Sequence, residues 1–296
     1  MDRNEPATAG HRKSLLKTNL IKDVQATVKR QIYGFPHVSK TGGTTILTIL
    51  RSTFGTAHCD VESWRGKHGN HLRPDGLRKL LKIHPHLKSV NGHAFRPYEN
   101  YEEVCSVRYF VMFREPIARC ISEYQHQLER RGKDWSFEHY INRVGFNNQT
   151  RFLCGKPDHK AAIKVIEEKN MVCGLLEKFD ESLMIFNKLV FQGTLNCSYS
   201  IKKAARKNNI RKKLLDDSAA LTLIEKNNAE DIKLYEYITK TRYPFHQKSY
   251  GESLSDDLAE FTPNGFNQTS IFLNRCYRNV VYKPSLKLHR LMNKTP

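Results

Sequence analysis

The chain has 296 residues, 39% of them hydrophobic and 27% charged, and its 13 tyrosines and 15 phenylalanines exclude extensive disorder. Its 49 lysines and arginines outnumber its 30 aspartates and glutamates, which indicates an anionic partner without choosing among nucleic acid, membrane, glycan and phosphate-rich cofactor. Seven cysteines that form no C-x-x-C pair argue against a structural zinc site.

The first half of the chain begins with a polar, basic segment, residues 1–30, which we expect to form a mobile N-terminal arm or a frayed helix. Its apolar runs are too short for a signal peptide core or for a membrane span of about 20 residues. A short buried strand is predicted over 31–38, followed by a turn and by a helix over 44–55 that Gly55 closes. Residues 56–91 are predicted to be irregular apart from one short helix over 74–82.

The second half repeats the order of strand and helix. A strand is predicted over 108–113 and a helix from Pro116 to about residue 130, since proline suits the first position of a helix. The remaining predictions are a strand over 171–176 and helices over 179–190, 201–215 and 219–239. Short β-runs that alternate with helices predict an α/β fold with a central parallel sheet covered on both faces. We expect residues 31–245 to form the main domain and residues 246–296 a partly irregular C-terminal extension.

The clearest motif is HVSKTGGTT, residues 37–45. Its small residues and two glycines allow backbone N–H groups to converge on a phosphate at a helix N-terminus, where the helix dipole also favours an anion. In the nucleoside-triphosphate P-loop the lysine follows the glycines, whereas Lys40 precedes them here.

The order K-T-G-G-T-T resembles the donor-binding loop of the sulfotransferases, in the form seen in carbohydrate enzymes such as the heparan sulfate 6-O-sulfotransferases. The resemblance implies a P-loop-like fold that uses 3′-phosphoadenosine 5′-phosphosulfate as cosubstrate and no metal. It also implies that Lys40 reaches the oxygen bridging phosphate and sulfate. The 5′-phosphate would be held by the backbone and hydroxyls of Thr41, Gly42, Gly43, Thr44 and Thr45.

A second motif, REPIARCISEY at residues 114–124, is similar to the R-D-P-x-x-R-x-x-S-E-Y element of the same family, with Glu115 in place of the usual aspartate. The resemblance implies that Arg114 and Ser122 bind the 3′-phosphate, and a guanidinium and a hydroxyl suit a phosphate dianion. The alternative is a plain helix start, with Ser122 bonded to its own helix. The weaker segment 147–153 is similar to N-x-Q-T-R-x-L, and its residues Gln149, Thr150 and Arg151 either line the cleft or fix the fold.

The candidate general base is His93, which lies between the two motifs in the segment VNGHAF, at an expected strand end. The resemblance implies that it accepts the proton of the acceptor hydroxyl, and a histidine is largely neutral at neutral pH. The alternative is a histidine that only bonds a backbone carbonyl at a turn. His37 lies within the strand that enters the loop, and we expect it to support the loop.

The acceptor is less well defined. A basic stretch could follow the anions of a glycosaminoglycan or be a solvated helix face, and it contains Lys202, Lys203, Arg206, Lys207, Arg211, Lys212 and Lys213. No aromatic residues are interleaved there, so we expect no nucleic acid partner. The function that follows is sulfuryl transfer to a hydroxyl of an anionic carbohydrate such as heparan sulfate. A small-molecule P-loop kinase and a non-catalytic polyanion-binding module are the alternatives.

The location is expected from the resemblance alone. Carbohydrate sulfotransferases of this kind are Golgi proteins with an N-terminal membrane anchor, which is not visible in this sequence, so a cytoplasmic location is the alternative. Sequons for N-glycosylation begin at Asn148, Asn196, Asn267 and Asn293 and matter only in the secretory pathway.

Overall fold

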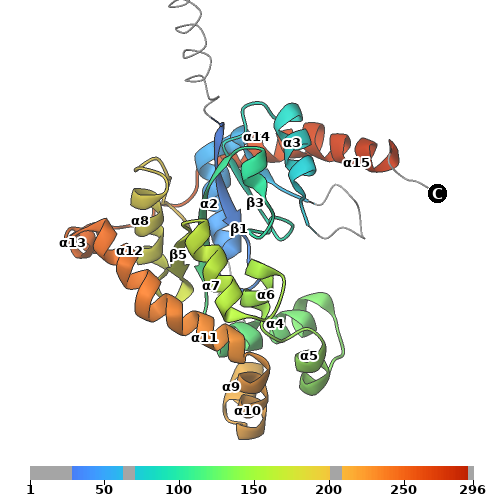
Figure 1. The fold of residues 1–296 in the computed structure, drawn as a ribbon, viewed down its shortest axis with the longest axis vertical. Helices are drawn as coiled ribbons and strands as arrows, with labels where there is room; N and C mark the ends of the chain where they lie inside the picture. The colour runs from blue at the N-terminus through green and yellow to red at the C-terminus, as the bar shows by residue number, and fades with distance from the viewer. Residues whose placement is uncertain (1–28, 63–70, 201–208, 293–296) are drawn as a thin grey trace, which may run out of the picture. The chain divides into compact units, whose positions relative to one another are not determined.

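The computed structural model describes residues 29–62, 71–200 and 209–292 (Figure 1). Residues Gln31–Pro296 form one compact unit, and Met1–Arg30 form another. The expected N-terminal arm therefore lies almost entirely outside the described residues.

The centre of the larger unit is a five-stranded sheet with the order β2-β3-β1-β4-β5. All four neighbouring pairs are parallel. The strands are β1 (Gln31–Pro36), β2 (His58–Asp60), β3 (Ser89–Gly92), β4 (Ser106–Phe113) and β5 (Val172–Leu175). The predicted parallel α/β fold is thus confirmed. Two of its strands, β2 and β3, fall in the stretch 56–91 that was predicted to be irregular, because three and four residues are too few to show a period.

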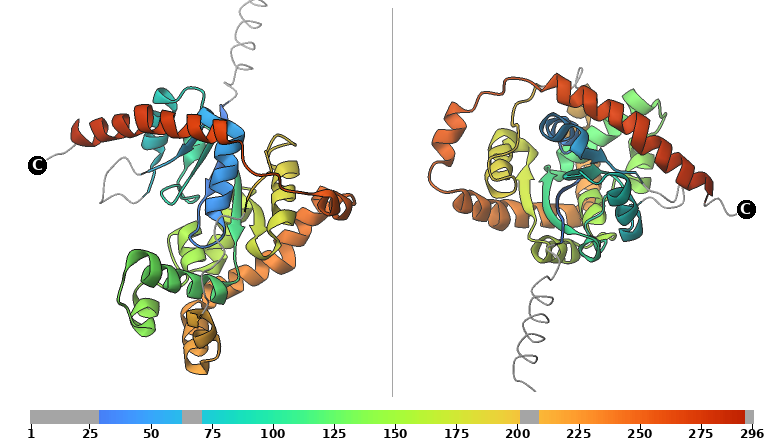
Figure 2. Two further views of the ribbon diagram at one scale, coloured as in Figure 1. Left: turned by 180° about the vertical axis from the view of Figure 1, so that it is seen from behind. Right: turned by 90° about the horizontal axis from the view of Figure 1, so that it is seen from above.

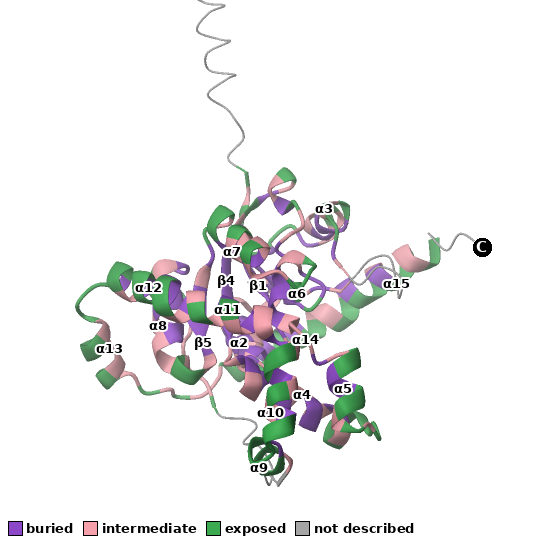
Figure 3. Ribbon diagram, turned by 60° about the horizontal axis from the view of Figure 1, so that its bottom comes forward, coloured by how far each residue is buried: buried purple, intermediate pink, exposed green. Residues whose placement is uncertain are grey.

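Helices cover both faces of the sheet. They are α2 (Gly43–Phe54), α3 (Pro74–Ile83), α4 (Pro116–Arg131), α5 (Phe137–Arg143), α6 (Asn148–Cys154), α7 (His159–Glu168), α8 (Phe179–Leu189), α9 (Asn209–Leu215), α10 (Ser218–Asn227), α11 (Ala229–Tyr237), α12 (Tyr243–Tyr250), α13 (Leu254–Glu260), α14 (Gln268–Tyr277) and α15 (Lys283–Met292). The end of β4 shows why both faces are covered, since Phe110 and Met112 pack with α2 and α8 while Val111 and Phe113 pack with α3, α6, α7 and α11. All four side chains are buried. Figure 3 colours the ribbon by burial and shows buried residues on β4.

The helix predicted over 219–239 is two helices, α10 and α11, because the chain breaks at the buried Asn228. The amide of Asn228 donates to the Gly145 carbonyl (3.1 Å) and accepts from the Asn147 N–H (3.0 Å). These long-range bonds have no signature in a local helical period. Of the helix predicted over 201–215, only α9 lies within the described residues.

The C-terminal extension contains more helix than its weak periodic signal indicated. Helices α14 and α15 are joined by a π-helical turn, Arg278–Tyr282, and run past the end of α2 (red in Figure 2). Asn274 donates to the carbonyls of Gly55 and His58, at 2.8 Å each, and the Tyr282 hydroxyl accepts from the Glu62 N–H at 2.8 Å. Among the residues of this extension up to 292, which the structure describes, only 261–267 form a longer irregular link. No helix among the described residues is long and apolar enough to cross a bilayer.

Candidate active site

The candidate site lies at the carboxyl ends of β1 and β4, which are parallel neighbours in the middle of the sheet. After β1 the chain continues to β2 and β3 on one side of β1, and after β4 it continues to β5 on the other side. This change of direction is the point where ligands of open α/β sheets bind, because the loops that follow the two strands diverge there. Both phosphate-binding motifs predicted from the sequence begin at these strand ends.

The loop after β1 turns tightly into α2. Lys40 and Gly42 both have left-handed backbone angles, with φ of 67° and 82°. Gly42 is the N-cap of α2, no side chain caps this end of the helix, and the first turn contains no acidic residue. The first N–H groups of an α-helix need partners from outside it and carry partial positive charge. The start of α2 is therefore suited to an anion.

The two glycines of the loop are required by their surroundings. A Cβ atom on Gly43 would lie 2.1 Å from the His37 ring, and one on Gly42 would lie 2.7 Å from Leu176 Cδ1. The hydroxyl of the buried Thr41 donates to the Val38 carbonyl at 3.0 Å, so this side chain holds the loop itself.

The second motif meets the first one directly. Arg114 follows β4, and its Nη1 donates to the Lys40 carbonyl at 3.2 Å. Ser122 lies on α4, half-buried, and its hydroxyl makes no hydrogen bond within the part of the chain that the structure describes. The alternative in which Ser122 bonds to its own helix therefore finds no support.

Glu115 takes the position where the family element has aspartate, and it is the N-cap of α4. Its carboxylate accepts from the Ile117 N–H at 2.8 Å and from the Ala118 N–H at 2.7 Å. A negatively charged cap also interacts favourably with the helix dipole. The substitution thus keeps the start of the helix intact.

Positive charge gathers around Arg114. Burial lowers the pKa of its guanidinium, and the nearby charges of Arg211 and Arg119 lower it further. The carboxylates of Glu177 and Glu115 oppose this shift. Because arginine stays protonated in proteins, these three cations repel one another. An anion at Arg114 would relieve that repulsion.

His93 follows β3 directly, as predicted, and its ring lies on that of His37, with centroids 4.2 Å apart and an angle of 25° between the planes. Its Nδ1 lies 2.7 Å from the His37 carbonyl oxygen. A carbonyl only accepts, so Nδ1 carries the hydrogen, and Nε2 of the neutral ring is left with the lone pair that a general base needs. The two sequence-based interpretations of His93, a general base and a histidine that bonds a backbone carbonyl, are therefore compatible, because the bond from Nδ1 to the carbonyl orients Nε2.

The pKa values of both histidine rings are lowered. Loss of hydration lowers the pKa of His93; the hydrogen bond to His37 and the Glu123 carboxylate oppose this, and the charges of Arg96 and Arg131 add to it. Burial and the neighbouring His93 lower the pKa of His37 to about 3. Both rings are therefore neutral near pH 7.

Three arginines bring positive charge to His93 or to its neighbours, and of the three the sequence singled out Arg151 alone. Arg96 and Arg131 act electrostatically on His93, and Arg151 acts on Arg96. The guanidinium of Arg96 lies 3.9 Å from the ring centroid of Phe152, and that of Arg151 lies 4.3 Å from the centroid of Phe146. They come from a loop and two helices, so only the fold brings them together.

The segment similar to N-x-Q-T-R-x-L divides into two parts. Gln149 and Thr150 are fully buried, and the Gln149 amide bonds both the N–H and the C=O of Arg114. Arg151 is exposed. The sequence left open whether these residues line the cleft or fix the fold. Burial and hydrogen bonding favour the second interpretation for Gln149 and Thr150.

The basic stretch lies partly outside the described residues, so positions 202, 203, 206 and 207 carry no structural statement. Arg211, Lys212 and Lys213 are exposed residues of α9, which packs against α4. Arg211 acts on Arg114 and therefore lies on the side of the candidate site.

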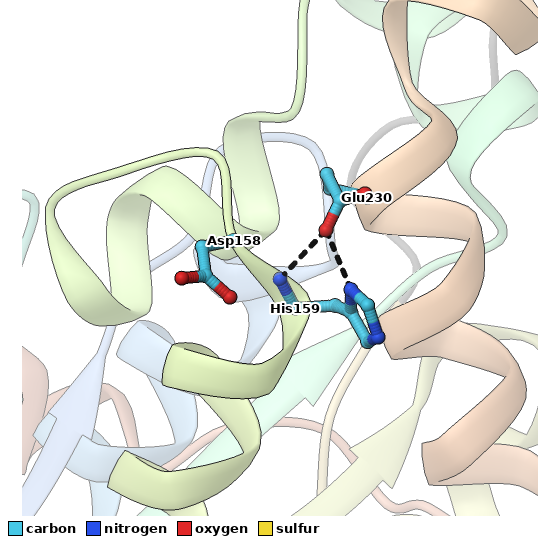
Figure 4. A group of neighbouring side chains, drawn as sticks. All are labelled: Asp158, His159 and Glu230. Carbon is cyan, nitrogen blue, oxygen red and sulfur yellow. Dashed lines mark hydrogen bonds and ion pairs between the residues drawn. The ribbon is translucent and has the colours of Figure 1, made fainter.

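Residues that could bind a metal ion form one cluster in the described part of the chain, apart from the candidate site. They are Asp158, His159 and Glu230, whose ligand atoms lie within 4.8 Å of one another (Figure 4). Asp158 caps α7 by accepting from the Ala161 N–H at 3.0 Å. Glu230 accepts from the N–H and from Nδ1 of His159, at 3.0 and 2.5 Å. These bonds join the start of α7 to α11.

Comparison with known proteins identifies the chain. A family model described as "Sulfotransferase family" matches residues 33–181, half of the chain, and this range includes the loop after β1, His93, Arg114 and Ser122. The search of curated proteins returned no match. With the family model spanning the sheet from β1 to β5 and both strand-end motifs, the chain belongs to the sulfotransferase family, whose chemistry is sulfuryl transfer.

Proposed function

We propose that the protein transfers the sulfuryl group of 3′-phosphoadenosine 5′-phosphosulfate to a hydroxyl of an anionic carbohydrate, such as a glycosaminoglycan. The observation that carries this proposal is the hydrogen bond from Arg114 to the Lys40 carbonyl, at 3.2 Å. It joins the loop at the start of α2 to the arginine after β4, so one nucleotide can bridge the two phosphate-binding motifs.

The residues at the two strand ends suit the two phosphate groups of the donor. The start of α2 would hold the 5′-phosphate with the backbone N–H groups of Gly42, Gly43 and Thr44 and with the hydroxyls of Thr44 and Thr45. The Thr45 N–H already donates to the Gly42 carbonyl at 3.0 Å. Thr41 would contribute through its backbone, because its hydroxyl already donates to the Val38 carbonyl. Arg114 and the hydroxyl of Ser122 would hold the 3′-phosphate, whose charge offsets the repulsion among the cations around Arg114.

The chemistry proposed for the chain is an in-line displacement at sulfur. Nε2 of His93 takes the proton of the acceptor hydroxyl as the new S–O bond forms. The S–O bond to the 5′-phosphate breaks, and Lys40 stabilises the negative charge that develops on the departing phosphate oxygen. Adenosine 3′,5′-bisphosphate is then released.

An anionic acceptor is favoured by the arginines that act on and around His93. Arg96, Arg131 and Arg151 bring positive charge to the side of the site where the hydroxyl must approach. Glu123 is the carboxylate that acts on the same ring, so positive charge exceeds negative charge there.

A Golgi location is part of the proposal and rests on the family resemblance. Of the sequon asparagines in the described residues, the amides of Asn148 and Asn196 donate to the Val144 carbonyl (2.9 Å) and to Ser52 Oγ (3.3 Å). We therefore expect glycan at Asn267 rather than at these two when the chain passes through the secretory pathway. Mass spectrometry of the secreted protein measures this occupancy.

The test of the enzymatic proposal is transfer of radiolabelled sulfate to desulfated glycosaminoglycans, with a neutral polysaccharide as comparison. We expect label in the anionic acceptors, loss of label in His93→Ala, and normal labelling in a variant of an exposed histidine on α5, His139→Ala. Label in no carbohydrate would contradict the proposed acceptor class. Normal transfer by His93→Ala would contradict the role of the base.

The two alternative functions are separated by binding. Thermal protection by adenosine 3′,5′-bisphosphate without metal supports the proposed donor, whereas protection by ATP with Mg²⁺ alone supports a small-molecule kinase. Donor binding with no transfer to any acceptor, in the wild type and in His93→Ala alike, supports a non-catalytic polyanion-binding module.

A further inference from the structure

The peptide group that carries Arg114 is held by a side chain far away in the sequence. The Arg114 N–H donates to Gln149 Oε1 at 3.1 Å, and Gln149 Nε2 donates to the Arg114 carbonyl at 2.9 Å. Gln149 thereby pairs with both backbone polar groups of Arg114, as a neighbouring strand would. Gln149 is fully buried, so water does not compete for these bonds.

Gln149 is itself held by Asp231, in the first turn of α11. One carboxylate oxygen accepts from the Gln149 N–H at 2.9 Å, and the other accepts from the N–H and the hydroxyl of Thr150 at 2.8 and 2.9 Å. Asp231 and Thr150 are also fully buried. A buried carboxylate that accepts three hydrogen bonds fixes its donors in one arrangement.

The starts of α6 and α11 cap each other. The side-chain oxygen Oδ1 of Asn147 accepts from the N–H groups of Glu230 and Asp231, at 3.0 and 3.1 Å. The backbone N–H of Asn147 donates to the Asn228 side chain at 3.0 Å. Asp231 in turn caps α6 through its bonds to Gln149 and Thr150. The two helix ends therefore move as one body, and Gln149 moves with them.

Arg119 supplies the opposite charge. Burial raises the pKa of Asp231, and the positive charge of Arg119 and the hydrogen bonds from Thr150 and Gln149 oppose this. Arg119 is fully buried, and its guanidinium nitrogens have no hydrogen-bond partner among the residues that the structure describes. Its charge also acts on Arg114. The charge of Arg119 thus acts both on the carboxylate that holds Gln149 and on the guanidinium that Gln149 positions.

We propose that Gln149 and Asp231 are positioning residues of Arg114, which set the direction of its side chain toward the 3′-phosphate of the donor. This inference rests on the proposed function, in which Arg114 binds that phosphate. Neither residue touches the nucleotide in this scheme. Their effect should therefore appear only in the part of the binding affinity that the 3′-phosphate contributes.

The experiment compares the affinities of full-length variants for adenosine 3′,5′-bisphosphate and adenosine 5′-monophosphate, measured by calorimetry. The ratio of the two affinities gives the contribution of the 3′-phosphate to binding. Gln149→Glu removes the donor to the Arg114 carbonyl, and Gln149→Met removes both bonds at similar volume, in case the charge prevents folding. Asn274→Asp is the matched control, because Asn274 is a buried amide that donates to two backbone carbonyls near the start of the edge strand β2, which β3 and β1 separate from β4.

We expect the ratio to fall about tenfold in the Gln149 variants, the value of a charge-assisted hydrogen bond that loses its geometry. Asn274→Asp should lower the melting temperature and leave the ratio unchanged. Arg114→Ala should lower the ratio as well, and adding Gln149→Glu to it should lower the ratio no further, because the two residues act through one contact.

Two results would overturn the proposal, and they differ. If the Gln149 variants weaken both nucleotides equally while Arg114→Ala lowers the ratio, Gln149 only stabilises the fold. If Arg114→Ala leaves the ratio unchanged, Arg114 does not bind the 3′-phosphate, and the proposed donor site fails together with the inference.

Discussion

The contact between Gly43 and His37 gives the sharpest test of the loop geometry. A Cβ atom on Gly43 would lie 2.1 Å from Cδ2 and Nε2 of His37. Gly43 has no left-handed backbone angle, so Gly43→Ala tests space alone and not backbone strain. The His37 ring cannot swing freely, since it stacks against Phe35 on one side (5.9 Å between centroids) and against His93 at 4.2 Å.

The size of the effect follows from the distances. Carbon atoms in ordinary contact are roughly 3.5 Å apart, so the His37 ring must move by more than about 1 Å. Overpacking of this kind costs about 1–3 kcal/mol of unfolding free energy. Because His93 stacks on the displaced ring, we also expect kcat to fall by about tenfold or more, as happens when a reacting group is misplaced by about 1 Å.

A double-mutant cycle measures the clash itself. The free energy of unfolding is determined in urea for the wild type, Gly43→Ala, His37→Ala and the double variant. In the His37→Ala background the ring is gone, and the added methyl group should cost less than about 0.5 kcal/mol. An equal cost of Gly43→Ala in both backgrounds would refute the reasoning, because the penalty would then come from the loop and not from His37.

Three further predictions concern charge and hydrogen bonding. Loss of hydration lowers the pKa of His93 below the usual 6.5, so kcat/KM should stay constant through neutral pH and decline only below that value. A decline centred above pH 7 would contradict this. Burial would raise the pKa of Asp60, but bonds from His58 and Arg51 hold it well below its usual range. The contribution of Asp60 to the free energy of unfolding is therefore present above about pH 4 and lost on acidification. Asp60→Asn should lower the free energy of unfolding by about 1–3 kcal/mol at pH 7 and make it depend less on pH in the acidic range. Tyr282→Phe removes the acceptor of a backbone N–H and should cost about 1 kcal/mol in urea unfolding without changing transfer activity.

The sequence was most informative where local rules apply. The strand, turn and helix around residues 31–55 follow from a short apolar run, two glycines and a helical period that Gly55 ends. The start of α4 at Pro116 and the position of His93 directly after β3 could be predicted for the same reason. Each of these features depends on neighbours within a few positions.

The features that the sequence did not reveal depend on contacts between distant positions. Nothing near Gln149 indicates that its amide pairs with Arg114, 35 positions away, or that Asp231 lies 82 positions further on. The break at Asn228 has the same origin, because bonds to Gly145 and Asn147 interrupt a helical pattern that is locally continuous. Tertiary contacts override local propensity in these places.

Several positions that violate local rules lie at or near the carboxyl ends of β1 and β4. A left-handed backbone at a residue with a side chain, such as Lys40 at φ 67°, costs roughly 1–2 kcal/mol. The buried Arg119 and the crowded cations around Arg114 add further cost, and none of these features improves the packing of the sheet. Such costs persist where the surrounding structure fixes them, and they concentrate at sites prepared for a ligand. In the proposed complex the 3′-phosphate at Arg114 would offset the repulsion among these cations, so ligand binding and fold stability should be coupled in this protein.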